Sequence, residues 1–549
     1  MNFLFVVPKI ARAGESYFFP IGFGYVVSYM KHKGFNVFCL NLCHYDASIE
    51  QQLHKCIKDK HIDVICTGAM SFYWNEVSEV VEIAKKINPE IITVVGGAII
   101  TADPKLVLEN MKIDYGVIGE GEITMAELAA ALTSDGEIAK VRGLIFHDND
   151  NGLTVTAPRE AISDLDSLPF PHDEGLEYSK WLSIKRVELS GVGALFHDID
   201  EKVRLHEIIT ARSCPYNCTF CYHPLGQKYR QRSLDNVFQE IDYLVRKYNT
   251  NVLNILDELF SFDEKRVYEF ASRIKKYNIR WMAQWRADNV NEKMLKILKD
   301  SGILTLGIGV ESMSDKVLKS MRKHTTKADV DKAFKLAGDA GVNAGGNLIF
   351  GDPEETEETI KESLDWRMKH PEYDIRLRWL LAVPDSQVWR HAIEHNLVSD
   401  KVQFIKSKFP VINLTKISDR KFNKIRRRIM YLDFTQLFMK GKVLSSKKES
   451  DTYEGKTVYA FTVECPLCHQ ISRYKHPLDT IRLYTIVLCK HCYHRIKIKT
   501  KKAFLDDYNV IHGFFYHLLF MYHVYLGRFV FFRSFYNIAK GFKRIMKKN

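Results

Sequence analysis

Three cysteines within eight residues carry the chemistry that this sequence indicates most clearly: Cys214, Cys218 and Cys221. Their Cys-x-x-x-Cys-x-x-Cys spacing can supply three thiolates to a four-iron cluster, which leaves one iron without a protein ligand. A zinc ion would need a fourth ligand at similar range, and the nearby His223 follows Cys221 too closely to complete a tetrahedron. The loop therefore predicts a [4Fe-4S] cluster with one iron open for chemistry.

The surrounding elements must bring this loop to the mouth of a sheet. A short apolar strand is expected at residues 207–210, and Pro215 and Asn217 favour the loop that follows. From there to about Pro384, strand-like and helix-like segments alternate six times, which predicts a parallel, barrel-like sheet. Active sites of such barrels lie at the carboxyl ends of the strands. Polar residues at or near those ends are Asp257, Glu258, Gln284, Arg286, Glu311, Arg376 and Arg378.

The cysteine motif, with Phe220 as the aromatic residue before its last cysteine, resembles that of the radical S-adenosylmethionine family. The resemblance extends from about residue 205 to about residue 390. In that family the open iron binds the amino and carboxylate groups of S-adenosylmethionine, and reductive cleavage yields a deoxyadenosyl radical. The resemblance therefore implies an enzyme that uses S-adenosylmethionine and an electron donor.

The same resemblance assigns residues to S-adenosylmethionine. It implies that Phe220 and the backbone around Tyr222 lie against the adenine. The pair Asp257 and Glu258 stands where the family offers groups to the methionine amino group, but the commoner element there is Gly-Gly-Glu.

Three more strand-end residues are assigned to the cofactor pocket. Glu311 resembles the family glutamate of the fourth strand, and Arg286 is expected to pair with the methionine carboxylate bidentately. Gln284 belongs to the same strand as Arg286 and is placed in the same pocket. The alternative for each of these residues is a strand-end salt bridge without a ligand.

The first 130 residues show a different pattern, in which apolar runs such as NFLFVV, DVICTGA and IITVVGG alternate with helical stretches. This predicts a doubly wound parallel sheet, with ligands beyond the carboxyl ends of its strands. Gly96 and Gly97 fall at one such end and residues 119–122 at another, where glycine lets a large ligand approach the backbone. A dinucleotide site is disfavoured because no GxGxxG turn follows the first strand.

Residues 1 to about 135 resemble the cobalamin-binding domain that precedes many radical enzymes. The resemblance implies cobalamin, with Ser71, Gly96 and Gly97 as the expected contacts by position. The Asp-x-His-x-x-Gly element that supplies an axial histidine in some cobalamin proteins is absent, and the segment around His44 does not fit it. A domain that no longer binds cobalamin remains the alternative.

The two resemblances together imply cobalamin-dependent methylation of an unactivated carbon in a small-molecule or lipid-like substrate. A cyclase, or another hydrogen-abstraction reaction without methyl transfer, is the alternative within the family. A cluster-containing sensor that binds a corrinoid is the alternative outside enzymes, and the many polar strand ends around an open iron disfavour it.

A second metal motif consists of two CxxC pairs separated by twenty residues, Cys465 with Cys468 and Cys489 with Cys492. Four thiolates close a tetrahedral site, so the motif predicts a structural zinc ribbon. An auxiliary iron-sulfur cluster is the alternative, because four cysteines serve either metal. Binding of nucleic acid is disfavoured, since no basic and aromatic array surrounds the motif.

The chain of 549 residues is long enough for several domains, and its eleven cysteines show no disulfide framework, which favours a reducing cytoplasm. The N-terminal apolar run reads as a strand and not as a signal peptide. A net charge of +12 and an aromatic, basic tail leave a peripheral membrane contact open, with residues 510–527 free of formal charge. The expected order is a cobalamin-binding-like domain (1–135), a connector (136–204), the radical barrel (205–400), a basic helical segment (401–455), the zinc ribbon (456–500) and the tail (501–549).

Overall fold

The computed structural model of the chain describes residues 1–15, 17–134, 136–148, 152–184, 198, 203–434, 438–453, 456–477 and 484–499. The chain divides into two compact units. The first unit comprises residues 1–196, 201–366 and 378–416, and the second comprises residues 197–200, 367–377 and 417–549. Each unit is described by itself.

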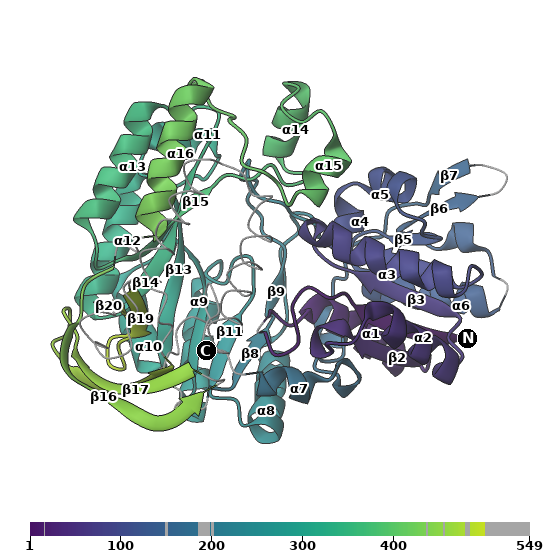
Figure 1. The fold of residues 1–549 in the computed structure, drawn as a ribbon, viewed down its shortest axis with the longest axis horizontal. Coiled ribbons are helices and arrows are strands. Elements are labelled where there is room, and N and C mark those ends of the chain that lie inside the picture. The colour runs from purple at the N-terminus through teal and green to yellow at the C-terminus, as the bar shows by residue number, and fades with distance from the viewer. Residues whose placement is uncertain are drawn as a thin grey trace, which may run out of the picture. The chain divides into compact units, whose positions relative to one another are not determined.

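The N-terminal part of the first unit is built on a seven-stranded sheet of order β2-β1-β3-β4-β5-β6-β7 (Figure 1). Strands β1 to β5 are parallel, whereas β6 and β7 are antiparallel. The strands are β1 (Asn2–Val7), β2 (Asn36–Asn41), β3 (Val64–Gly68), β4 (Ile92–Gly96), β5 (Tyr115–Val117), β6 (Leu144–Asp148) and β7 (Gly152–Val155). The helices are α1 (Ile21–His32), α2 (Ile49–Lys60), α3 (Trp74–Ile87), α4 (Ala98–Ala102), α5 (Pro104–Asn110) and α6 (Gly121–Thr133).

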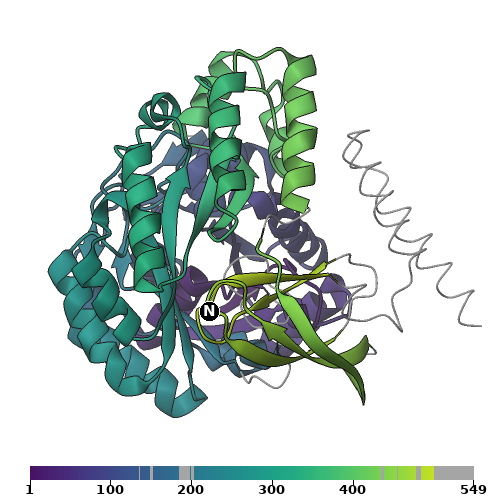
Figure 2. The same cartoon turned by 90° about the vertical axis from the view of Figure 1, so that its left-hand side faces the viewer.

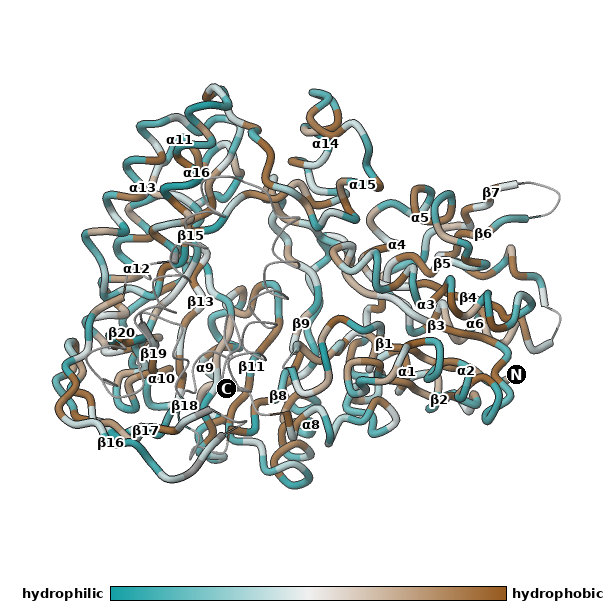
Figure 3. The backbone as a smooth tube through the Cα atoms, viewed as in Figure 1, coloured by the Kyte–Doolittle hydropathy of each residue, from teal (hydrophilic) through white to brown (hydrophobic). Residues whose placement is uncertain are grey.

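The strand order reverses between β1 and β3, and this makes the carboxyl ends of these strands the expected ligand edge. Strand β1 is buried from Phe3 to Val7, as a central parallel strand covered on both faces must be. Figure 3 accordingly colours the central strands of this sheet as hydrophobic. The predicted doubly wound sheet is confirmed, and it is extended by β6 and β7 from the expected connector.

The central part of the first unit holds a six-stranded sheet of order β15-β14-β13-β12-β11-β8, in which each strand lies beside the one before it. The strands are β8 (Leu205–Ile208), β11 (Val252–Ile255), β12 (Arg280–Arg286), β13 (Ile303–Glu311), β14 (Ala344–Phe350) and the edge strand β15 (Asp374–Trp379), of which residues 374–377 are assigned to the second unit. The intervening helices include α8 (Leu234–Tyr248), α9 (Glu264–Ile274), α10 (Glu292–Asp300), α12 (Lys327–Ala340) and α13 (Glu357–Lys369). Helix α10 contacts both α9 and α12, and Figure 2 shows this outer row of helices. The predicted parallel, barrel-like sheet is confirmed.

Helix α8 shows why the sequence folds locally as expected. Ser233 caps the helix by accepting a hydrogen bond from the backbone N–H of Asn236, and the apolar residues at helical spacing are buried. The sequence did not predict the short antiparallel hairpin of β9 (Ala211–Arg212) and β10 (Arg230–Gln231), which closes the neck of the cysteine loop.

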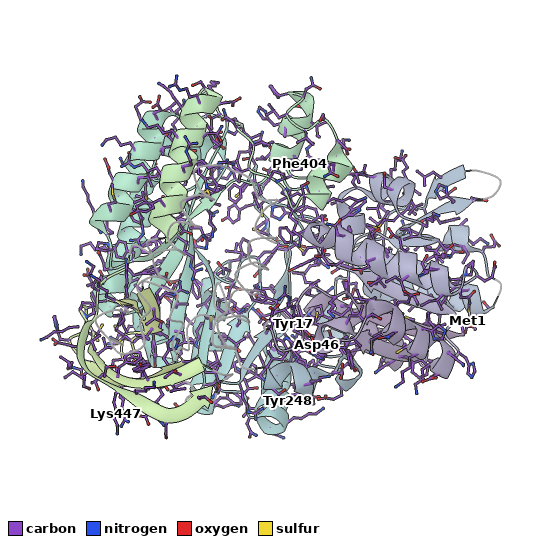
Figure 4. All side chains as sticks on the ribbon, in the orientation of Figure 1. Met1, Tyr17, Asp46, Tyr248, Phe404 and Lys447 are labelled. Atoms are coloured by element: carbon purple, nitrogen blue, oxygen red, sulfur yellow. The ribbon has the colours of Figure 1, made fainter. Side chains whose placement is uncertain are left out.

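After the barrel, the chain packs against the N-terminal part of the same unit. Helices α14 (Gln387–Glu394) and α15 (Lys401–Lys406) share a hydrophobic core with Trp74 and Val77 of α3. Phe404, labelled in Figure 4, packs on Trp389 with ring centroids 5.8 Å apart. This segment therefore fastens the barrel to the N-terminal sheet.

The second unit contains α16 (Asp419–Phe434), a three-stranded antiparallel sheet of β16 (Lys442–Tyr453), β17 (Lys456–Glu464) and β18 (Ile471–Pro477), and a hairpin of β19 (Tyr484–Leu488) and β20 (Arg495–Lys499). The expectation of a helical segment through residue 455 is wrong for β16, because this polar stretch pairs with β17. No helix among the described residues is both long and apolar enough to cross a membrane. The expected interfacial tail, 501–549, lies outside the described residues.

Candidate functional site

The cysteine loop runs from residue 213 to residue 229, between β9 and β10, and is held at several points. Ser213 enters it with a positive φ of 70°, and its hydroxyl donates to the carbonyl of Leu225 at 3.0 Å. Further along, the N–H of Thr219 donates to the carbonyl of Met321 and its carbonyl accepts from the N–H of Val388. The loop is therefore fixed from both the barrel and α14.

All three loop cysteines are free thiols of intermediate burial. Within the described residues their sulfur atoms are not gathered as tightly as ligands of a single ion would be. The cysteine ligands of a four-iron cluster bind different irons, so they need not converge on one point. Burial raises the pKa of the Cys214 and Cys218 thiols, so iron must displace protons when it binds. The donor set fits a [4Fe-4S] cluster.

The two members of the predicted acidic pair have different surroundings. Asp257 is buried, and its carboxylate accepts hydrogen bonds from the hydroxyl and N–H of Thr210 and from the N–H of Ala211. Burial raises the pKa of Asp257 to about 6, against the effect of these hydrogen bonds. Glu258 keeps a third of its side chain exposed and contacts Nδ1 of His223 at 3.0 Å. Asp257 thus fastens the strand that leads to the cysteine loop, and Glu258 is the more accessible carboxylate.

Arg286 is held by several groups of the barrel and of the cysteine loop. Its guanidinium already holds a carboxylate, that of Asp288, through Nε at 3.0 Å and a terminal nitrogen at 2.8 Å. It also donates to the carbonyls of Lys323 and His324, and lies 3.8 Å from the ring centre of Tyr216 in the cysteine loop. Arg286 therefore supports the cysteine loop, and its pairing with the methionine carboxylate of S-adenosylmethionine stays a prediction.

Glu311 ends β13 with a positive φ of 60° and accepts a hydrogen bond from Nζ of Lys323 at 2.7 Å. Both side chains are largely buried, and Glu311 raises the pKa of Lys323 although burial alone would lower it. A Cβ at Gly309 would lie only 2.4 Å from Nζ of Lys323, so a side chain there would displace the ammonium from its present position. Sequence reasoning missed Lys323, whose place in a turn gave no periodic signal.

Gln284 is exposed, and its side chain lies over Gly307 of the neighbouring strand, where a Cβ would come within 2.7 Å of Oε1. Phe220 is partly buried against the core that contains α14 and α15. The hydroxyl of Tyr222 donates to the carbonyl of Ala98 in α4 at 3.0 Å, so the loop touches the N-terminal sheet domain. Contact of Phe220 and Tyr222 with an adenine stays a prediction.

The expected ligand edge of the N-terminal sheet is lined by glycine backbone. Gly97 has a positive φ of 83°, and Gly119 has a positive φ of 78° with no atom within 4 Å of a Cβ built on it. Ser71 is buried just after β3, whereas the adjacent Met70 and Phe72 are exposed. Open backbone and exposed apolar side chains fit a large, flat macrocycle such as a corrin. Sequence reasoning missed Met70 and Phe72, although both follow a strand end.

His44 has no ring nitrogen to offer a metal. Its Nε2 lies 2.9 Å from the hydroxyl of Tyr17, labelled in Figure 4, and its Nδ1 lies 3.1 Å from the carboxylate of Glu177. Burial lowers the pKa of His44. Both ring nitrogens of His44 are therefore hydrogen-bonded to other side chains, and His44 does not lie in an axial-ligand motif.

The four-cysteine group of the second unit is closed. Sulfur atoms of Cys465 and Cys492 lie 3.7 Å apart, those of Cys468 and Cys489 lie 3.6 Å apart, and all four are within 4.8 Å of one another. A tetrahedron with zinc-sulfur bonds of about 2.3 Å has edges of about 3.8 Å. The geometry fits one zinc ion with no open position.

Comparisons with known proteins agree with this arrangement. Residues 208–367 match the family model of the radical SAM superfamily, and residues 9–129 match that of the B12 binding domain. The chain belongs to the cobalamin-binding radical S-adenosylmethionine enzymes. A protein of Pyrococcus horikoshii named as an uncharacterized methyltransferase is 28% identical, with 77% of this chain and 89% of the relative covered.

Two more proteins are similar to this chain. The anaerobic magnesium-protoporphyrin IX monomethyl ester cyclase of Rubrivivax gelatinosus is 26% identical, with 79% of each chain covered. The solved radical S-adenosylmethionine methyltransferase TsrM of Kitasatospora setae is 19% identical and superimposes with a TM-score of 0.58, over 72% of this chain and 76% of that chain. At this identity the likeness to TsrM shows a shared fold.

Proposed function

We propose that this enzyme transfers a methyl group to an unactivated carbon of a small-molecule or lipid-like substrate, with cobalamin as a cofactor. The observation that supports this most is that one unit holds both an open three-thiol loop and a glycine-lined ligand edge that fits a corrin. Relatives named as methyltransferases, among them the one from Pyrococcus horikoshii, favour the same reaction.

The residues of this chain have separable tasks in that reaction. Cys214, Cys218 and Cys221 hold the cluster and leave one iron open for S-adenosylmethionine. With these groups bound, the cluster and S-adenosylmethionine supply a radical that removes hydrogen from carbon, and cobalamin supplies the methyl group. The barrel orients the substrate and keeps water away from it.

The strand-end residues orient S-adenosylmethionine. Glu258 offers an accessible carboxylate beside the loop, which suits the amino group of the methionine part. Glu311 is held in one orientation by Lys323, so its second oxygen can meet a hydroxyl or an amine without loss of side-chain freedom. Met70 and Phe72 provide the apolar contact for the corrin at the edge of the N-terminal sheet.

A cyclase of the same family is the second candidate, favoured by the likeness to the Rubrivivax gelatinosus enzyme. The two reactions make the same demands on the cluster and on S-adenosylmethionine. They differ in the product, because methyl transfer adds a carbon to the substrate and cyclisation does not.

The test uses the anaerobically reconstituted full chain with hydroxocobalamin, a chemical reductant and S-adenosylmethionine that carries a deuterated methyl group. An extract of the source cells, divided into aqueous and lipid fractions, provides the substrates. Methyl transfer predicts stoichiometric cobalamin on the desalted protein and a product that gains one deuterated methyl group. Formation of 5′-deoxyadenosine with an altered substrate that gains no label would overturn methyl transfer in favour of the cyclase.

A further inference from the structure

Two arginines face each other at the neck of the cysteine loop. Arg212 ends β9 directly before Ser213 and Cys214, and Arg230 begins β10 directly after the loop. The antiparallel register of the hairpin makes these arginines cross-strand partners. Like charges in directly opposite positions destabilise a strand pair, and here both side chains are also buried. The hairpin by itself would therefore not keep this neck closed.

The missing negative charge comes from the N-terminal sheet domain. The carboxylate of Glu120 accepts from Arg212 at 2.7 Å and from Arg230 at 2.8 Å, so it bridges the two arginines. Glu122 accepts from the other terminal nitrogen of Arg212 at 2.6 Å. Two acids and two bases thus balance in a site where each residue is at most 8% exposed.

Further contacts hold this group rigidly. Arg230 also donates to the carbonyl of Ile162 at 2.7 Å and to the hydroxyl of Ser213 at 3.2 Å, while Glu120 accepts from the N–H of Ile162. The guanidinium of Arg212 lies 5.0 Å from the ring centre of Tyr25 in α1. Burial would raise the pKa of Glu120, but the two arginines hold it below its ordinary value, so the carboxylate stays charged.

Glu120 also lies next to the ligand edge of the N-terminal sheet. Glu120 precedes the first residue of α6 and follows Gly119, whose open backbone belongs to the ligand edge of the N-terminal sheet. The same residue thus touches the neck of the cluster loop and adjoins the edge that fits cobalamin. The hydroxyl of Tyr222 makes a second contact from the loop to α4 of that domain.

We propose that Glu120 is a positioning residue that closes the neck of the cysteine loop and thereby aligns the cluster with the ligand edge of the N-terminal sheet, an inference that rests on the proposed function. S-adenosylmethionine must bind the open iron in one geometry. If the neck of the loop opens, we therefore expect the rate of 5′-deoxyadenosine formation to fall before iron is lost from the cluster. A displacement of about 1 Å at a reacting centre can cost about 100-fold in rate.

The test compares Glu120→Gln, Arg230→Gln and the double variant with wild type in the full chain. Glu137→Gln is the control, since Glu137 also pairs with a base at 2.8 Å but is 70% exposed. The readouts are the electron paramagnetic resonance spectrum of the reduced cluster before and after S-adenosylmethionine is added, and the rate of 5′-deoxyadenosine formation. Circular dichroism and urea denaturation report whether each variant folds, and the zinc content of the second unit should stay unchanged.

Glu120→Gln is expected to bind iron, to lose the spectral change that S-adenosylmethionine induces, and to form 5′-deoxyadenosine about 100-fold more slowly. The double variant should recover about tenfold, because removing one charge of each sign restores the balance with Arg212 and Glu122. A wild-type spectral change and rate in Glu120→Gln would overturn the inference. If Glu120→Gln does not fold, the double variant decides. A double variant that also fails to fold, or that forms no more 5′-deoxyadenosine than the single variant, would overturn the inference.

Neither readout needs cobalamin or the substrate. Failure to detect a methylated product would therefore refute the proposed function and leave this test intact. Conversely, methyl transfer by wild type together with an unaffected Glu120→Gln would refute only the role of Glu120.

Discussion

The protein contains two cysteine sites that differ in almost every physical respect. The four thiols of the second unit converge to within 4.8 Å, with the small core of that unit packed around them. The three thiols of the loop are spread along a turn whose surroundings are held by Asp257, Arg286 and Glu120, which lie outside the cysteine motif. Zinc binding can drive the folding of the residues around the closed site. The open site, in contrast, depends on residues of the barrel and the N-terminal sheet domain that are already folded.

The largest effect should come from the open site. Cys218→Ser removes one of three cluster ligands, and we expect 5′-deoxyadenosine formation to fall below detection, since two cysteines do not hold the cluster whose open iron binds S-adenosylmethionine. Iron analysis and chromatography of the products measure this. Zinc should remain on the protein; its loss would mean that the two sites are not independent.

Loss of a ligand at the closed site should affect zinc and the folding of the ribbon, but not the cluster of the loop. Cys489→Ser breaks the tetrahedron, and because structural zinc contributes about 10 kcal/mol of apparent binding energy, we expect the ribbon to lose both zinc and its fold. Cys66→Ser, which alters a buried cysteine outside both sites, is the control for metal content. Zinc analysis and proteolysis detect the change, and the cluster of the loop should still form. A ribbon that binds iron instead of zinc would show that the distinction between the sites is wrong.

A smaller effect, on the stability of the barrel, is expected from the buried ion pair of Lys323 and Glu311. Lys323→Met leaves the buried carboxylate of Glu311 without its partner, and we expect the free energy of unfolding to fall by about 3–5 kcal/mol. Lys86→Met is the matched control, because Lys86 pairs with Glu50 at 2.9 Å on the surface and its loss should have little effect. Denaturation in urea measures both. Equal stabilities for the two variants would contradict the buried role of Lys323.

The smallest effect should appear in the pH dependence of stability. Burial, aided by Asp352, raises the pKa of Glu355 from 4.5 to about 8. Because the folded pKa lies above the unfolded one, the stabilisation is full below about pH 4.5 and is lost as the pH rises through about 8.

Glu355→Gln should therefore flatten the decline of stability between about pH 4.5 and about pH 8, measured by urea denaturation at each pH. Glu354→Gln is the neighbouring control, since the side chain of Glu354 is 39% exposed and pairs with Lys316 and Lys416. An unchanged slope in Glu355→Gln would show that the carboxyl is ionised in the folded barrel.

Much of this molecule could be predicted from the sequence because its signals are local. The spacing of Cys214, Cys218 and Cys221 predicts the cluster site, and the two CxxC pairs predict the four-cysteine site, because each metal fixes the separation of its ligands. The alternation of apolar runs and amphipathic helices predicts both parallel sheets, since burial on both faces leaves a continuous apolar strand. The comparisons confirm the family that these patterns indicate.

The partners of the polar residues could not be predicted in the same way. Arg286 meets Asp288 two residues later, but Glu311 meets Lys323 and Glu120 meets Arg230 across folds of the chain that leave no periodic trace in sequence. The sequence by itself thus determined the two cysteine sites, the family with its cofactors, and the two parallel sheets. Only the tertiary structure decided which charged side chains hold the cysteine loop. Ion pairs in a buried site depend on the distance between two groups in space and not on their separation along the chain.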